Sequence, residues 1–268
     1  MMNNPKHCIL ALLCALLSGL PVLADSRIDS TPDLAQNDPA AGLPYGGAPY
    51  CGPVAVSNAL IWLSKEGYPK LFQGGGDGKL TARSQGRMVA RLALYMNTTR
   101  SMGTTVNGFL KGVERYVQSR GYEIDSLTYS GWESCYPEYF TGQKNVSPET
   151  IIEALNTKTA VWLKVGWYRY VPGKSEYRRF AGHWVTVVSC KRLPDGVYEV
   201  SIKDSAARSG IEPRTEKVLL SPLKEGTILT SWAPAFPSRG VYSMKGELKI
   251  KKGADEGILD GIVILKMR

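Results

Sequence analysis

The hydrophobic pattern of this 268-residue chain changes about halfway along. Residues 54–63 are apolar at nearly every position, which is typical of a helix that is buried on all sides. The spacing of apolar residues predicts two further helices, at 84–96 and 106–120. Later runs of β-branched and aromatic residues between turns predict strands at 160–167, 183–190, 197–203, 217–220, 241–250 and 258–265. Helices followed by strands predict an α+β fold, with helices packed on an antiparallel sheet.

The first 24 residues have the pattern of a secretory signal peptide. Lys6 gives a weakly positive start, residues 9–20 form an apolar core, and Val22-Leu23-Ala24 is a small-residue cleavage pattern. The apolar run is short for a membrane span. The leader therefore predicts a secreted or periplasmic protein that has no membrane span after the signal is cleaved.

The rest of the chain is expected to form one large domain. Cleavage leaves 268 − 24 = 244 residues, enough to bury a sizeable core. Residues 25–49 are rich in Pro, Gly, Ala and Asp, which predicts an irregular arm over the surface. This domain is expected at 50–268, with a C-terminal β extension from about residue 210.

The net charge of the mature chain is 9 − 1 = +8, because the leader contains one lysine and no acidic residue. The basic residues are scattered along the chain, which favours anionic surroundings such as a cell envelope. No nucleic-acid-binding motif accompanies them. We therefore expect no nucleic-acid partner.

Cys51 and His183 have the residue types and positions of a catalytic pair. Cys51 stands where the apolar helix should begin, and His183 is the only histidine after the leader. Unpaired N–H groups at a helix start stabilise a thiolate and lower the pKa of the thiol. A nearby imidazole can serve as the base. The backbone N–H of Cys51 can supply half of an oxyanion hole, and Gly52 lets a substrate backbone approach.

Asp204, at the end of the next predicted strand, is the candidate for orienting His183. A turn centred on Leu193-Pro194 places Asp204 opposite His183 in an antiparallel pair. A tighter turn centred on Asp195-Gly196 places Arg208 there instead. The first register completes a Cys-His-Asp triad.

Three cysteines remain after the leader, which is an odd number for an exported protein. Either Cys51 forms a disulfide, or it is free and Cys135 can pair with Cys190. Strand alternation places Cys190 on the face away from His183, which argues against Cys190 as the nucleophile. The spacing of cysteines and histidines fits no zinc site, so neither a metal nor a cofactor is expected.

Three segments together resemble the Cys, His and Asp motifs of the C39-like cysteine peptidases, which belong to the papain-like superfamily. The segments are Cys51-Gly52-Pro53-Val54-Ala55, Gly182-His183-Trp184-Val185-Thr186-Val187-Val188 and Ile202-Lys203-Asp204-Ser205. The resemblance covers roughly residues 45–206. It implies a papain-like fold in which a buried N-terminal helix carries the nucleophile and packs on an antiparallel sheet. We also expect Gly52, Gly182 and Trp184 to contact substrate.

One feature of that family is missing from the expected place. The family usually has a glutamine a few residues before the nucleophile, as the second oxyanion donor, and residues 43–50 contain none. Tyr45 occupies that neighbourhood and is the candidate substitute. Gln36 and Asn37 lie further back and would reach the site only through an unusual loop.

These residues favour an exported cysteine peptidase, or more broadly an amide hydrolase, that acts through a thioester acyl-enzyme. Its expected substrate is a protein or peptide, including cell-envelope peptides. A transglutaminase-like acyl transferase would use the same three residues with an amine in place of water. A non-catalytic binding protein on a papain-like scaffold is the other alternative. Its ligand would bind an aromatic and basic hairpin at 168–180.

Overall fold

The computed structural model describes residues 27–75, 78–206, 212–231 and 233–268. The predicted signal peptide at 1–24 and Arg208 lie outside the described residues. The helices are α2 (Cys51–Lys65), α3 (Ala82–Tyr95), α4 (Val106–Ser119) and the short α5 (Glu149–Ala154). The three predicted helices are thus confirmed. None of the helices in the described part of the chain combines the length and apolar character that a membrane crossing requires.

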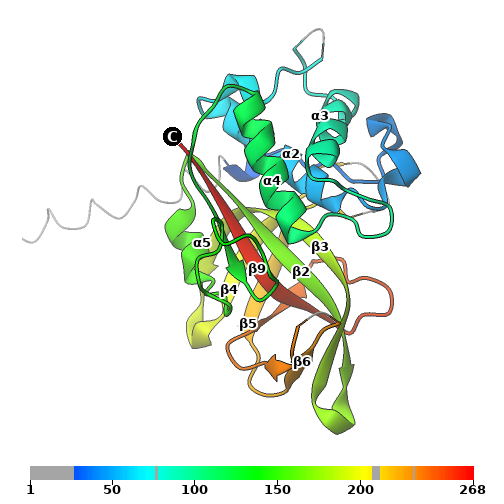
Figure 1. The fold of residues 1–268 in the computed structure, drawn as a ribbon, viewed down its shortest axis with the longest axis vertical. Helices are drawn as coiled ribbons and strands as arrows, with labels where there is room; N and C mark the ends of the chain where they lie inside the picture. Colours follow the sequence, from blue (N-terminus) through cyan, green and yellow to red (C-terminus); the bar gives the residue numbers. More distant parts are fainter. Residues whose placement is uncertain (1–26, 76–77, 207–211, 232) are drawn as a thin grey trace, which may run out of the picture.

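Six strands form a closed antiparallel barrel. Their order is β2–β3–β4–β5–β8–β9, and β9 pairs back onto β2. These strands are β2 (Thr159–Val171), β3 (Glu176–Arg192), β4 (Tyr198–Asp204), β5 (Glu216–Pro222), β8 (Tyr242–Gly246) and β9 (Glu256–Met267). Three further strands extend the sheet: β1 (Ile124–Gly131) on β9, β6 (Thr227–Leu229) on β3, and β7 (Phe236–Pro237) on β6. Helices α2, α3 and α4 gather at one end of this barrel (Figure 1).

The predicted papain-like α+β fold is therefore wrong. The chain is mostly β, with a closed six-stranded antiparallel barrel, three extra strands and only a few helices. Side-chain patterns predict that a segment is a strand, but they do not say which strand it pairs with. The last strand, β9, pairs with both β2 and β8 and so closes the sheet. The stretch beyond residue 210, predicted as an extension, supplies three of the six barrel strands.

Successive residues of β2 face two different cores. Val161, Leu163 and Val165 point into the barrel, where they pack with residues of β3, β4, β5, β8 and β9. Trp162 points the other way, into a core formed with α2, α3 and α4. Because both faces of β2 are covered, ten consecutive residues of this strand are buried.

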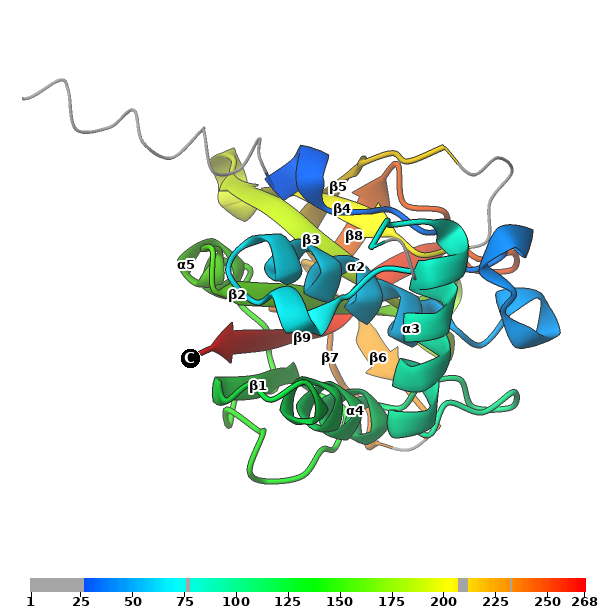
Figure 2. The same ribbon diagram turned by 90° about the horizontal axis from the view of Figure 1, so that it is seen from above.

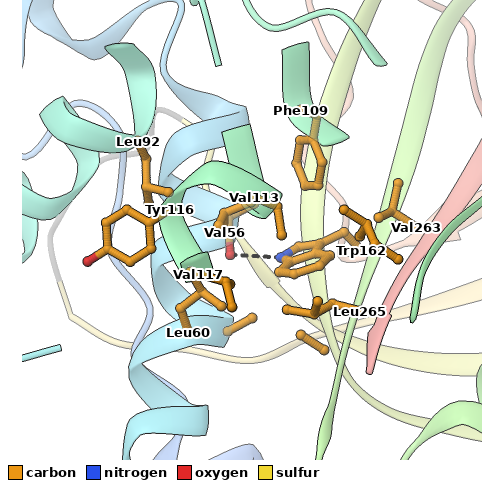
Figure 3. Close-up of a cluster of buried hydrophobic side chains, with 14 of the residues drawn as sticks. Val56, Leu60, Leu92, Phe109, Val113, Tyr116, Val117, Trp162, Val263 and Leu265 are labelled. Atoms are coloured by element: carbon orange, nitrogen blue, oxygen red, sulfur yellow. Dashed lines mark hydrogen bonds between the residues drawn. The ribbon is translucent and has the colours of Figure 1, made fainter. Parts of the chain in front are cut away.

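Helix α2 is central to the second core. It contacts β2 and β3 on one side and α3 and α4 on the other, as Figure 2 shows from above. Figure 3 shows Val56 and Leu60 of α2 in the same cluster as Trp162. The indole N–H of Trp162 donates a hydrogen bond to the carbonyl of Ala55, 3.1 Å away. These contacts fix the start of α2, where Cys51 lies, against strands β2 and β3.

Candidate active site

Cys51, His183 and Asp204 come together in the structure. Nε2 of His183 lies 2.6 Å from Oδ1 of Asp204, and both side chains are buried. The thiol of Cys51, at the first position of α2, is hydrogen-bonded to His183. Because Nε2 is occupied by Asp204, Nδ1 is the ring nitrogen left for the thiol. The result is a continuous thiol–imidazole–carboxylate chain.

Neither predicted register between the two strands is correct. Asp204 pairs with Val185 and not with His183, and a bulge between Val187 and Ser189 shifts the alignment by one residue. Residues two apart on a strand lie on the same face. The Asp204 side chain therefore reaches His183 diagonally, across one step of the ladder. The turn itself already sets a different alignment, with Arg192 paired to Tyr198, and the bulge then shifts that alignment by one more residue.

The surroundings favour a thiolate–imidazolium pair. Burial acts to raise the pKa of Cys51, but the hydrogen bond and charge of His183, the charge of Lys164 and the backbone N–H of Trp184 lower it below its ordinary value. Burial acts to lower the pKa of His183, but the charge and hydrogen bond of Asp204, together with Cys51, raise it to about 10. For Asp204, the opposing effect of burial is outweighed by His183, so its pKa is lowered.

All three cysteines among the described residues are free thiols, so neither disulfide left open by the sequence is formed. The bulge in β3 also changes the predicted position of Cys190, which packs in the same cluster as Val185 and Val187. Burial, followed by the charge of Glu149, raises the pKa of Cys190 to about 12. Of the three thiols, only that of Cys51 has a lowered pKa.

Two cavities meet at Cys51. A large cavity of about 620 Å³ extends past Gly103, Lys164 and Trp184. A small cavity of about 270 Å³ extends past Gln36 and His183 to the loop at 249–252. The two cavities share Ala48, Cys51 and Gly182. An extended substrate can therefore pass over the thiol with one part in each cavity.

The predicted substrate-contacting residues occupy different places. Gly182 lines both cavities and Trp184 lines the large one. Gly52 is buried, and an added Cβ would lie 2.9 Å from the side chain of Thr104. The small size of Gly52 thus serves the packing of α2 against Thr104. The side chain of Tyr45, the predicted oxyanion donor, is 62% exposed and lies against Arg100.

The N-terminal arm does form the unusual loop that brings Gln36 to the site. Two short 3-10 helices, Pro39–Ala41 and Pro44–Gly47, fold the arm back so that Gln36 lines the small cavity beside the thiol. The backbone N–H of Gln36 donates to the carbonyl of Ser205 at 2.9 Å, and its side-chain amide donates to Ala48 at 3.1 Å. The Pro- and Gly-rich composition of this arm was the signal for such tight turns.

Gly47→Ala is expected to displace Gln36 from the small cavity. Gly47 has φ +76° and is pressed against the backbone of Gln36, so that an added Cβ would overlap its carbonyl oxygen. Gly46 has a similar φ of +61° with open space around it, which makes Gly46→Ala a matched control for backbone strain alone. Crystal structures of both variants test this. A Gln36 position unchanged in Gly47→Ala would contradict it.

No group of three or more His, Cys, Asp or Glu side chains in the described part of the chain is arranged to hold a metal ion. A scan against protein-family models and a search of curated proteins found no match to this chain.

Proposed function

We propose that this protein is an exported cysteine-type amide hydrolase that acts on proteins or peptides, including cell-envelope peptides. The observation that carries the proposal is the buried chain from Cys51 through His183 to Asp204, at the meeting point of two cavities. Export is a prediction from the leader sequence. The motif resemblance to C39-like peptidases supports the same chemistry, but the papain-like fold is not part of the proposal.

The reaction begins with attack of the Cys51 thiolate on the substrate carbonyl carbon. The C–N bond breaks as the His183 imidazolium protonates the departing amine, which leaves a thioester on Cys51 and a neutral imidazole. The imidazole then takes a proton from water, and the resulting hydroxide equivalent attacks the thioester. The resulting tetrahedral intermediate breaks its C–S bond and expels the Cys51 thiolate, so that the carboxylic acid product leaves and the thiolate–imidazolium pair is restored. Asp204 keeps the ring oriented and stabilises its charged form.

Two donors are available for the developing oxyanion. One is the backbone N–H of Cys51, at the start of a helix whose first N–H groups are unpaired. The other is the side-chain amide of Gln36, which lines the same small cavity. An amide NH₂ has two hydrogens, and the hydrogen bond to Ala48 uses one of them.

Gln36→Ala is expected to lower kcat by about 100- to 1000-fold, as loss of one oxyanion donor does. Alkylation of Cys51 by iodoacetamide should hardly change, because this reaction forms no oxyanion. The neighbouring exposed amide gives a matched control, and Asn37→Ala should retain kcat. A Gln36→Ala variant with full kcat would show that Gln36 is not an oxyanion donor.

The proposed function is tested with a library of internally quenched peptides and the variants Cys51→Ala and Cys135→Ala. Hydrolysis that is lost in Cys51→Ala and kept in Cys135→Ala supports the proposal. If products form only when an amine is added, and carry that amine, the protein is an acyl transferase. If no peptide is cleaved and Cys51 reacts as an ordinary thiol, the enzyme proposal fails and a binding role replaces it.

A further inference from the structure

The ammonium group of Lys164 is unusual in this structure. The residue is only 6% exposed and lines the large cavity, with Nζ 4.6 Å from the ring centre of Trp184. Among the described residues, no hydrogen bond or ion pair is made to this nitrogen. A buried cation without a hydrogen-bonding anion is unfavourable. The ammonium group of Lys164 can therefore donate hydrogen bonds to an anionic group in the cavity.

The nearby carboxylates are held by another residue. Arg179 donates from Nε to Asp260 at 2.7 Å and from Nη2 to Glu133 at 2.9 Å. Asp260 also accepts hydrogen bonds from Tyr168 and Trp132. These carboxylates reduce the charge around the cavity but leave the hydrogen-bonding capacity of Lys164 unused.

Acylation of the thiol increases the need for an anion near Lys164. Burial lowers the pKa of Lys164, and the negative charge of the Cys51 thiolate is one of the charges that oppose this effect in the free protein. That charge disappears when the thiolate becomes a neutral thioester. A substrate that brings its own negative charge to Lys164 would compensate for this loss and stabilise the acyl-enzyme.

The two cavities differ in their access to the catalytic proton. His183 and Trp167 line the small cavity, so the amine that His183 protonates departs on that side. The acyl part of the substrate then lies in the large cavity with Lys164. An added Cβ at Gly182 would lie 3.1 Å from Nζ of Lys164 and 2.8 Å from Nη2 of Arg179. The glycine keeps the approach to both cations open.

We propose that the large cavity is an acyl-side subsite in which Lys164 binds a carboxylate of the substrate. This inference rests on the proposed function, which it extends from amide bonds in general to acidic substrates. The carboxylate has two possible sources. It is either the side chain of an acidic residue in an ordinary peptide, or the free α-carboxylate of a residue joined through its side chain.

The experiment compares matched peptide anilides. One pair has Glu or Gln at acyl-side positions, and a second pair is γ-linked glutamyl anilide with its α-carboxylate free or blocked as an amide. We expect kcat/KM to be about 10- to 100-fold higher for the acidic member of at least one pair, the range for a hydrogen bond between charged groups. Lys164→Met should reduce that ratio to near one. Lys224→Met, at an exposed lysine, should leave it unchanged.

The outcomes separate this proposal from the proposed function. The same four peptides are titrated by calorimetry against Cys51→Ala, so that binding is measured without catalysis. If Cys51 is rapidly alkylated at pH 6 but wild type shows no preference for the acidic member of either pair, the proposed subsite is wrong and the proposed hydrolase activity is not contradicted. If Cys51 is an ordinary thiol but acidic peptides still bind preferentially, the proposed hydrolase activity is wrong and the anion-binding site is supported. The wild-type ratio decides the subsite even if Lys164→Met fails to fold, in which case Lys164→Gln tests the residue assignment.

Discussion

His183→Ala is expected to slow the alkylation of Cys51 by iodoacetamide at pH 6 by about 100-fold. In wild type, the hydrogen bond and charge of His183 overcome burial and lower the pKa of the thiol. Without the imidazole, burial acts with less opposition and the pKa rises. An ordinary thiol of pKa about 8.5 is ionised in roughly one molecule in 300 at pH 6. The lower intrinsic nucleophilicity of a low-pKa thiolate offsets part of that difference.

Cys135 provides an internal control for this experiment. It is a free thiol whose pKa is raised, mainly by burial and also by Glu138, and it takes no part in the site. Its alkylation rate, measured by mass spectrometry in the same samples, should be the same in wild type and His183→Ala. Equal rates of Cys51 alkylation in the two proteins would show that His183 does not activate the thiol.

Trp162→Ala is expected to lower the free energy of unfolding by about 3–5 kcal/mol, the usual range for removing a buried aromatic side chain. Trp162 is fully buried and packs edge-to-face on Phe109, with ring centroids 5.4 Å apart. Its indole N–H also donates a hydrogen bond to the carbonyl of Ala55 in α2. Urea denaturation followed by circular dichroism measures the change.

The matched control for this prediction is a large apolar residue outside the core. Leu94 is 81% exposed, so Leu94→Ala should change the free energy of unfolding by less than about 0.5 kcal/mol. Trp162→Phe keeps an aromatic ring but loses the hydrogen bond, and should fall between wild type and Trp162→Ala. A loss below about 1 kcal/mol in Trp162→Ala would mean that this cluster does not hold α2 in place.

The elements of this fold were more predictable than their arrangement. The three long helices and the six barrel strands follow from local apolar spacing and turn residues, which act over a few positions. Closure of the barrel depends on β9, which pairs with β2 about a hundred positions earlier in the chain. No local pattern specifies such a partner. β1 was missed because its buried face contributes only Leu127 and Tyr129 as large apolar residues, too few to show a clear alternation.

The site shows the same division between local and long-range information. Cys51 could be identified at the start of an apolar helix, and His183 as the only histidine after the predicted leader. Gln36 reaches the small cavity because of two tight turns in the arm, whose combined geometry the sequence does not specify. Lys164 is one of many scattered basic residues, and only the folded structure shows that its ammonium group is buried beside Cys51.

The most direct test of the central claim is the protonation state of His183. Apart from His7 in the predicted leader, it is the only histidine, so ¹⁵N NMR of histidine-labelled protein that lacks residues 1–24 reports on one ring. With a pKa of about 10, both ring nitrogens should remain protonated from pH 6 to pH 8, paired with the Cys51 thiolate. A ring that loses a proton within that range, with an ordinary transition near pH 6.5, would mean an un-ionised thiol and would contradict the proposed nucleophile.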